Sequence, residues 1–158
     1  MRHTESGFTA IELIVVILII GLVAFMAIPL MANVLDALDV SKAKGAAEQV
    51  ASAIEQTRAY AILQSAQYRV RFPGNNQIQI DCVASCPTGA PSEGPTIIAN
   101  NGQVAPAGGA DPGCAGGGWC IWFNSTGTSI AKSIIVNAGP DQRTVTVTVA
   151  GRVRVTVP

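Results

Sequence analysis

The feature that most constrains this chain is an apolar segment near its N-terminus. From Leu13 to Ala32 every residue is apolar, when Gly21 and Pro29 are counted as neutral. About 20 such residues are enough for a helix to cross the hydrocarbon core of a bilayer. Because the Arg2 charge favours a cytoplasmic N-terminus, we expect a single-pass anchor with the rest of the chain outside.

One acidic residue, Glu12, stands at the head of this apolar segment. A carboxylate at a membrane-buried helix position is costly and usually serves a function with a specific partner. A cation, such as the amine at the head of an adjacent helix, would be a suitable partner for it. Glu12 is therefore a candidate assembly residue.

The combination of Gly7, Phe8, Glu12 and the apolar helix resembles the class III signal of type IV pilins and of type II secretion pseudopilins. The resemblance implies that a prepilin peptidase removes residues 1–7 as a leader and methylates the new N-terminus at Phe8. It also implies that Glu12 neutralises the N-terminal amine of a neighbouring pilin or pseudopilin subunit. The protein would first reside in the inner membrane and later enter a pilus or pseudopilus.

Two more positions in the apolar segment match this family. Gly21 and Pro29 correspond to positions where assembled pilins loosen the stem helix, and a proline removes one intrahelical hydrogen bond. The expected organisation is a leader at 1–7, a transmembrane and polymerisation half of the helix at 8–35, and a periplasmic or extracellular domain at 36–158.

Beyond the apolar segment the sequence becomes periodic. Apolar and small residues recur every three or four positions from Val40 to Ala61, which indicates a helix with one buried face and no strong stop before Gln64.

Alternation with a period of two, or a short apolar run, predicts strands at Tyr68–Phe72, Gln77–Ile80, Trp119–Phe123, Ser133–Val136, Thr144–Val149 and Arg152–Val157. The segment from Cys82 to Gly118 is interpreted as irregular, with one short strand at Pro95–Ala99. The expected fold class is α+β, the type IV pilin-like fold of a long N-terminal helix packed on antiparallel sheet.

The four cysteines, Cys82, Cys86, Cys114 and Cys120, all lie beyond the apolar segment. In an exported domain disulfides are the default, and the C-x3-C and C-x5-C spacings match no zinc ribbon. Three pairings are possible, and sequence alone does not choose among them. We favour the local pairs Cys82–Cys86 and Cys114–Cys120 slightly, and we expect no metal site.

The sequence offers little for catalysis. The single histidine is His3, inside the expected leader, so the processed chain would have no histidine for general base or nucleophile activation. The run Gly116–Gly118 has no Lys-Ser or Lys-Thr after it and opens no helix, so it is not a phosphate-binding loop. We expect that the protein is not an enzyme and binds no cofactor.

The C-terminal part narrows the family resemblance. The segments Trp122–Gly127, Arg143–Val147 and Gly151–Val155 are similar to the GspH/FimT group of minor pilins and minor pseudopilins. Within the last segment, Gly151-Arg152-Val153-Arg154 matches the G-R-x-R motif of FimT-type minor pilins. The resemblance implies a role in DNA binding during uptake, with which those minor pilins are linked. The resemblance therefore implies a FimT-like minor pilin, with a GspH-like minor pseudopilin of a type II secretion system as the alternative.

The arginines of this motif have a geometry that suits phosphate binding. On a strand, Arg152 and Arg154 point to the same face roughly 6.6 Å apart, while Val153 faces the core. Two guanidinium groups so placed could bridge adjacent phosphates of DNA, and Arg143 is expected near them across the turn. The alternative is an ordinary solvated strand face, where outward arginines are common.

Overall fold

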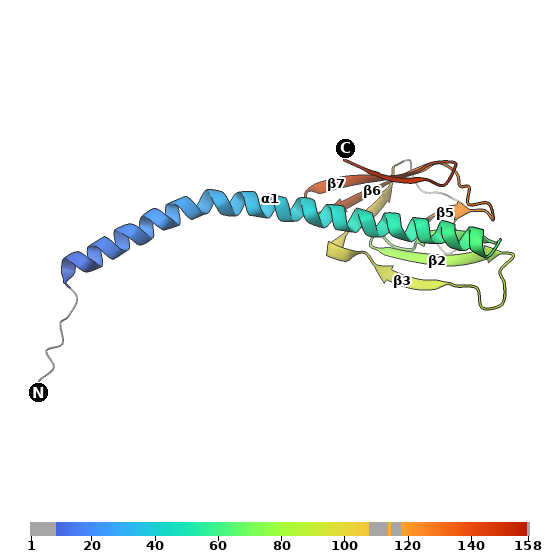
Figure 1. The fold of residues 1–158 in the computed structure, drawn as a ribbon, viewed down its shortest axis with the longest axis horizontal. Helices are drawn as coiled ribbons and strands as arrows, with labels where there is room; N and C mark the ends of the chain where they lie inside the picture. Colours follow the sequence, from blue (N-terminus) through green and yellow to red (C-terminus); the bar gives the residue numbers. More distant parts are fainter. Residues whose placement is uncertain (1–8, 108–113, 115–117, 158) are drawn as a thin grey trace, which may run out of the picture. The chain divides into compact units, whose positions relative to one another are not determined.

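The structure is a computed structural model that describes residues 9–107, 114 and 118–157, without the side chains of residues 27–36. It divides into two compact units, Met1–Leu38 and Asp39–Pro158. The elements, in chain order, are α1 (Ala10–Leu63), β1 (Gln67–Phe72), β2 (Gln77–Ala84), β3 (Glu93–Ile97), the 3-10 helix η1 (Ala99–Asn101), β4 (Gln103–Pro106), β5 (Trp119–Phe123), β6 (Lys132–Ala138), β7 (Asp141–Val147) and β8 (Val153–Thr156) (Figure 1).

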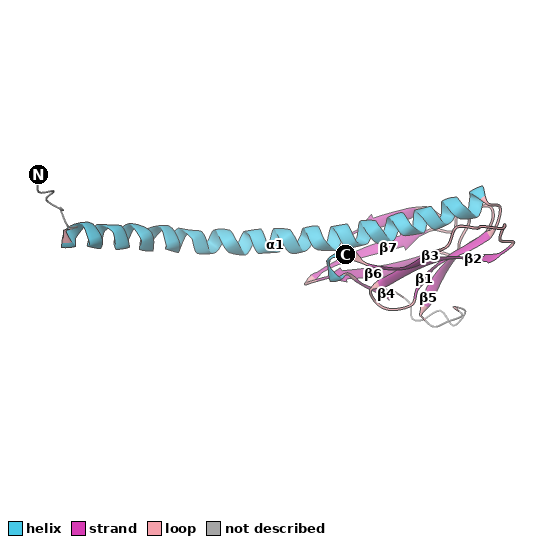
Figure 2. Ribbon diagram, turned by 90° about the horizontal axis from the view of Figure 1, so that it is seen from below, coloured by secondary structure: helices cyan, strands magenta, loops and turns pink. Residues whose placement is uncertain are grey.

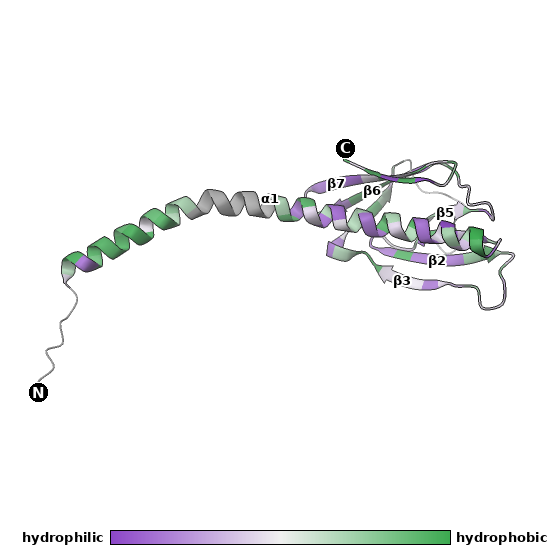
Figure 3. Cartoon of the chain, in the orientation of Figure 1, coloured by the Kyte–Doolittle hydropathy of each residue, from purple (hydrophilic) through white to green (hydrophobic). Residues whose placement is uncertain are grey.

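The first unit contains the N-terminal part of α1. Residues 10–26 are helical and exposed, and their hydrophobic character is visible in Figure 3. Among the residues that the structure describes, no helix meets the length and hydropathy required to cross a membrane.

The second unit combines the C-terminal part of α1 with two four-stranded antiparallel sheets. The strand order is β3-β2-β1-β5 in the first sheet and β4-β6-β7-β8 in the second (Figure 2). The strands β2 and β3 lie on one side of this part of the helix, and β6 and β7 lie on the other (Figure 1). The α+β fold class predicted from the sequence is therefore confirmed.

The helix contributes one continuous face to the core of this unit. The fully buried residues of that face are Ala43, Ala46, Ala47, Val50, Ile54, Thr57 and Ala61. Four of these are alanines, whose short side chains allow the strands to pack close to the helix backbone. The hydroxyl of Thr57 donates a 2.7 Å hydrogen bond to the carbonyl of Ala53, so its burial leaves no unpaired donor. The predicted face is confirmed from Ala43 onward, whereas Val40 is 42% exposed.

The strands supply the other half of the core. Buried residues alternate along β1, whereas four of the five residues of β5 are buried, and Phe72 stacks on Trp119 with ring centroids 4.0 Å apart. Tyr68 is fully buried, and its hydroxyl has no hydrogen-bond partner among the described residues. Burial raises the pKa of Tyr68, and the nearby Tyr60 adds to the rise.

The segment Cys82–Gly118 contains more regular structure than the sequence predicted. Strand β3 lies at Glu93–Ile97 instead of Pro95–Ala99, and η1 and β4 follow it. Most residues of β3 are exposed, so no alternating pattern marks this strand, and pairing with β2 holds it in place. The side chain of Gln49 on α1 adds two bonds, because its amide donates to the Ile97 carbonyl at 3.3 Å and accepts from the Ala99 N–H at 2.6 Å.

Candidate functional site

The arginine motif lies at the hairpin between β7 and β8. Gly151 has a φ of +73°, a conformation that glycine adopts without steric cost. Its N–H donates to the Thr148 carbonyl at 2.8 Å, and the Thr148 N–H donates to the Arg152 carbonyl at 2.9 Å. The Thr148 hydroxyl also accepts a 3.1 Å bond from the Arg152 N–H. These bonds fix the backbone from which the first arginine of the motif extends.

Arg152 and Arg154 are both exposed, whereas Val153 between them is half-buried and packs against the core. This alternation matches the prediction from the sequence. Within the described part of the chain, neither guanidinium group makes an ion pair or a side-chain hydrogen bond. Both positive charges are therefore available to an external anion.

Arg143 does not belong to this arrangement, and its predicted proximity to the motif is wrong. Arg154 pairs with Thr146 across β7 and β8, so these two residues share a face of the sheet. Arg143 instead shares the opposite face with the fully buried Val145 and Val147, and its Nε is buried. It is also three residues from Thr146 along β7, about 10 Å.

The structure brings a part of α1 beside the motif instead. Glu55, Arg58, Ala59 and Ile62 on the helix and residues 151–154 on the hairpin line an open groove of about 450 Å³. We call it the helix–hairpin groove. Three arginines and one glutamate contribute to its lining, so positive charge predominates.

Arg58 is the groove residue that sequence reasoning missed. Its Nε–H donates a 3.1 Å hydrogen bond to the carbonyl of Gly127, which lies in the turn after β5. On the helix it is simply a polar residue between buried positions, and its neighbours in the groove lie far away in the sequence. No local pattern could therefore have identified it.

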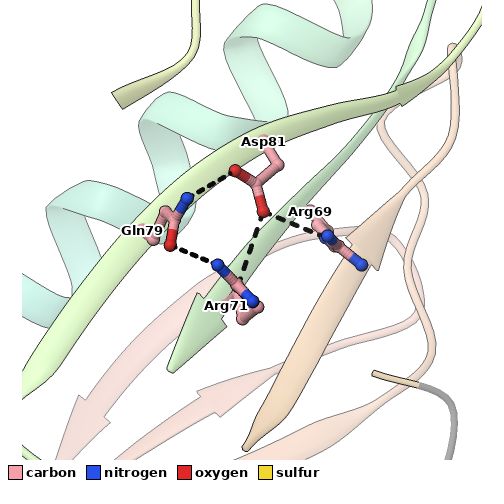
Figure 4. Close-up of polar contacts among 4 residues, drawn as sticks. All are labelled: Arg69, Arg71, Gln79 and Asp81. Carbon is pink, nitrogen blue, oxygen red and sulfur yellow. Dashed lines mark hydrogen bonds and ion pairs between the residues drawn. The ribbon is translucent and has the colours of Figure 1, made fainter. Parts of the chain in front are cut away.

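A second cluster of charged side chains lies on the first sheet, across β1 and β2 (Figure 4). Arg69 and Arg71 both approach Asp81, with nitrogen–oxygen distances of 3.2 Å and 3.6 Å. Gln79 accepts a hydrogen bond from Arg71 and donates one to Asp81. The side chains of Arg69, Arg71 and Asp81 are only 15–18% exposed. Because these arginines are paired and largely covered, they are less available to an external anion than those of the motif.

The cysteines follow the predicted local pairing only in part. Cys82 and Cys86 form a disulfide with a Cα–Cα distance of 5.9 Å. Cys114 and Cys120 are both buried, and the structure does not join them, so the second favoured pair is not confirmed. Cys120 lies within β5, in register with Arg71 of β1. In the described residues, no three His, Cys, Asp or Glu side chains gather as a metal site would require.

The assembly residues predicted in the stem are described in part. Glu12 caps its own helix: its carboxylate accepts bonds from the N–H and the hydroxyl of Thr9 at 3.0 Å and 2.9 Å, and its N–H approaches the Thr9 hydroxyl at 3.4 Å. This reciprocal arrangement is a capping box. Gly21 is exposed within α1. Gly7, Phe8 and the side chain of Pro29 lie outside the described residues.

Comparison with known proteins matches this chain to one family. The sequence model of the family described as "Type II transport protein GspH" matches residues 46–151, more than half of the chain. The match includes Gly151 and ends before Arg152 and Arg154. No curated protein matches the chain significantly in sequence.

Solved structures support the same fold. The type IV minor pilin FimU of Pseudomonas aeruginosa is similar with a TM-score of 0.53 and 14% identity, over 73% of this chain and 96% of FimU. The minor pseudopilin EpsH from the type 2 secretion system of Vibrio cholerae is similar with a TM-score of 0.53 and 16% identity, over 74% of this chain and 98% of EpsH.

Proposed function

Because this chain belongs to the GspH family of type II transport proteins and is a subunit of the minor pilin or minor pseudopilin class, we propose that it is a FimT-like minor pilin that binds DNA through Arg152 and Arg154. Its role is then assembly into a pilus and capture of DNA for uptake, with no catalytic step. Binding is to phosphates, so it depends little on base sequence.

The observation that supports this proposal most directly is the exposure of two unpaired arginines on a fixed hairpin. Arg152 and Arg154 are both exposed, and the bonds of Thr148 with the backbone of residues 151–152 fix the turn that carries them. Paired arginines such as Arg69 would have to break an ion pair before they bound a phosphate. The motif arginines incur no such cost.

Salt-dependent DNA binding by the full chain in neutral detergent tests the proposal. Each phosphate contact adds about 0.9 to the slope of log affinity against log salt for duplex DNA. The double variant Arg152→Gln/Arg154→Gln should therefore lower both the affinity and the slope, by close to 2 in the slope. A double variant of the exposed lysines, Lys42→Gln/Lys44→Gln, removes the same charge and should leave binding nearly unchanged. Equal affinities for the wild type and the arginine variant would refute the DNA-binding role.

The alternative is a minor pseudopilin of a type II secretion system, in which the sheets dock other tip subunits. The description of the matching family and the similarity to EpsH favour this second candidate. Co-purification with other minor pseudopilins, together with no retention on DNA, would select it over the first.

The assembly steps are also part of the proposal. A prepilin peptidase cleaves after Gly7 and methylates Phe8, which leaves residues 8–35 as the transmembrane and polymerisation half of the helix. The exposed apolar side chains of residues 11–26 support an anchor in the inner membrane, with residues 36–158 in the periplasm. During assembly Glu12 pairs with the N-terminal amine of a neighbouring subunit. Mass spectrometry of the mature protein tests the cleavage and the methylation, and a full-length mass would contradict both.

A further inference from the structure

The helix–hairpin groove contains a third arginine besides the two of the motif. Arg58 is half-buried, and its Nε is held by the Gly127 carbonyl at 3.1 Å. A Cβ atom at residue 151 would lie 2.7 Å from Nε and 3.0 Å from Cδ of Arg58. The side chain of Arg58 therefore packs directly against the glycine of the motif.

This contact leaves the outer end of the Arg58 side chain available. Of the nitrogens of the guanidinium group, only Nε has a hydrogen bond to another described residue. The two terminal nitrogens carry further N–H donors, and a planar guanidinium presents such donors in a fixed fork that matches phosphate oxygens. Because one edge of the group is already anchored, little side-chain freedom remains to be lost on binding.

The same groove also contains a carboxylate, whose effect on phosphate binding is opposite to that of the three arginines. Glu55 is exposed, three residues before Arg58 on α1, and it forms no ion pair with an arginine among the residues described. An unpaired carboxylate at this position repels an incoming phosphate. The charges of the groove thus include one group that weakens the binding of a polyanion.

We infer that the helix–hairpin groove is a nucleic-acid backbone site in which Arg58 contacts a phosphate together with Arg152 and Arg154, while Glu55 limits the affinity. This inference rests on the proposed DNA binding and extends it to the helix. The motif arginines belong to the hairpin wall of the groove and Arg58 to the helix wall, so a phosphate backbone that enters the groove is contacted from both sides.

Two variants of Arg58 separate its charge from its structural bond. Arg58→Gln and Arg58→Lys both lose the Nε–H donor to Gly127, but only Arg58→Lys keeps the positive charge. In the full chain, Arg58→Gln should lower the slope of log affinity against log salt by about 0.9, and Arg58→Lys should keep the wild-type slope. Equal losses of affinity and slope in both variants would overturn a phosphate contact and leave only a positioning role.

Glu55→Gln should change the DNA affinity in the opposite direction to the arginine variants. Removal of the carboxylate should raise the DNA affinity at low salt about two- to fivefold, the range expected for a single exposed charge interaction. The gain should shrink as salt is added, because salt screens exposed charges. An unchanged or lower affinity would contradict the role given to Glu55. Removal of an exposed carboxylate of α1 that does not line the groove, in Glu48→Gln, is the control and should change affinity little.

The failure of this inference can be told apart from the failure of the proposed function. If Arg152→Gln/Arg154→Gln weakens binding and Arg58→Gln does not, only the third contact is wrong. If the double variant binds as the wild type does, or if the full chain retains no DNA, the proposed function fails and the inference fails with it. Thermal unfolding of each variant identifies losses of binding that are caused by misfolding.

Discussion

Gly127 and Gly151 pack directly against each other, because a Cβ atom at position 151 would lie only 2.2 Å from the carbonyl oxygen of Gly127. The same carbonyl accepts the hydrogen bond from Arg58. The turn after β5, the helix and the hairpin of the arginine motif therefore meet at one carbonyl group.

Gly151→Ala should lower the free energy of unfolding by about 2–4 kcal/mol. Alanine is strained at a φ of +73°, and its Cβ would collide with the Gly127 carbonyl oxygen at 2.2 Å as well as with the Arg58 side chain. Urea unfolding measures the loss. Gly94→Ala is the control, since a Cβ there meets nothing within 4 Å and should change stability by less than about 0.5 kcal/mol. Similar values for the two variants would contradict this account of the motif glycine.

Tyr68→Phe should raise the free energy of unfolding by about 1 kcal/mol. The substitution removes a buried hydroxyl that has no partner among the described residues, and so removes its desolvation cost. Tyr60→Phe is the matched comparison, because the Tyr60 hydroxyl accepts a 2.8 Å bond from Gln56 and donates a 3.2 Å bond to Glu93. That variant should be less stable than the wild type, and a loss of stability in both variants would argue against the prediction.

The same tyrosine predicts a dependence on alkaline pH. Because burial raises the pKa of Tyr68, the folded state resists loss of the proton more than the unfolded state does. The pH-dependent part of the stability that comes from this raised pKa is fully present below the ordinary tyrosine pKa near 10. It is lost as the pH rises through the pKa of Tyr68 in the folded state. Unfolding measured from pH 8 to pH 11 should show a smaller decline for Tyr68→Phe than for the wild type. Parallel curves would show that another group causes the decline.

Asp81→Asn should lower the free energy of unfolding by about 2 kcal/mol. The variant leaves the charges of Arg69 and Arg71 largely covered and without their carboxylate, and breaking a buried pair costs more than breaking an exposed one. Lys44→Gln disrupts the 3.8 Å pair with Glu48, whose side chains are more than 60% exposed, and should cost less than about 0.5 kcal/mol. Chemical unfolding of both variants measures the two losses in free energy of unfolding. Equal losses would contradict the prediction.

Replacement of the disulfide by Cys82→Ser/Cys86→Ser should lower the free energy of unfolding by about 2 kcal/mol at most. The bridge joins residues only four positions apart, and in the chain-entropy model a short loop gives a small stabilisation. A non-reducing peptide map should recover Cys82 and Cys86 in one linked peptide. A linkage of Cys82 to Cys114 or Cys120 would overturn the assignment.

Much of the fold was predictable because the spacing of apolar residues in the sequence follows the side chains that are buried. The helix face from Ala43 to Ala61 follows from a spacing of 3.6, and the strand Tyr68–Phe72 follows from a spacing of 2. Strand β4 lacked such a signal, since only Val104 among its residues is buried and the strand ends in a proline. Its pairing with β6 comes from tertiary structure, which a local pattern does not contain.

The site was predictable only on the hairpin. Arg152 and Arg154 were found from a local motif, and the alternation around Val153 was correct. The position of Arg143 could have been excluded, because it lies an even number of residues from the buried Val145 and thus on the same face. The helix side of the groove could not be predicted, since Arg58 and its partner Gly127 are 69 residues apart in the chain.

The capping box at the start of α1 has a consequence for filament assembly and disassembly. The carboxylate of Glu12 is already satisfied by two hydrogen bonds from Thr9 in the isolated subunit. An amine from a neighbouring subunit would therefore replace the bonds from Thr9. The net free energy of assembly from this residue would be the difference between the ion pair with the amine and the bonds with Thr9. If Glu12 pairs with a neighbour's amine as proposed, a subunit that leaves the filament can form the Thr9 bonds again, so its carboxylate regains hydrogen-bond donors although it loses the opposite charge.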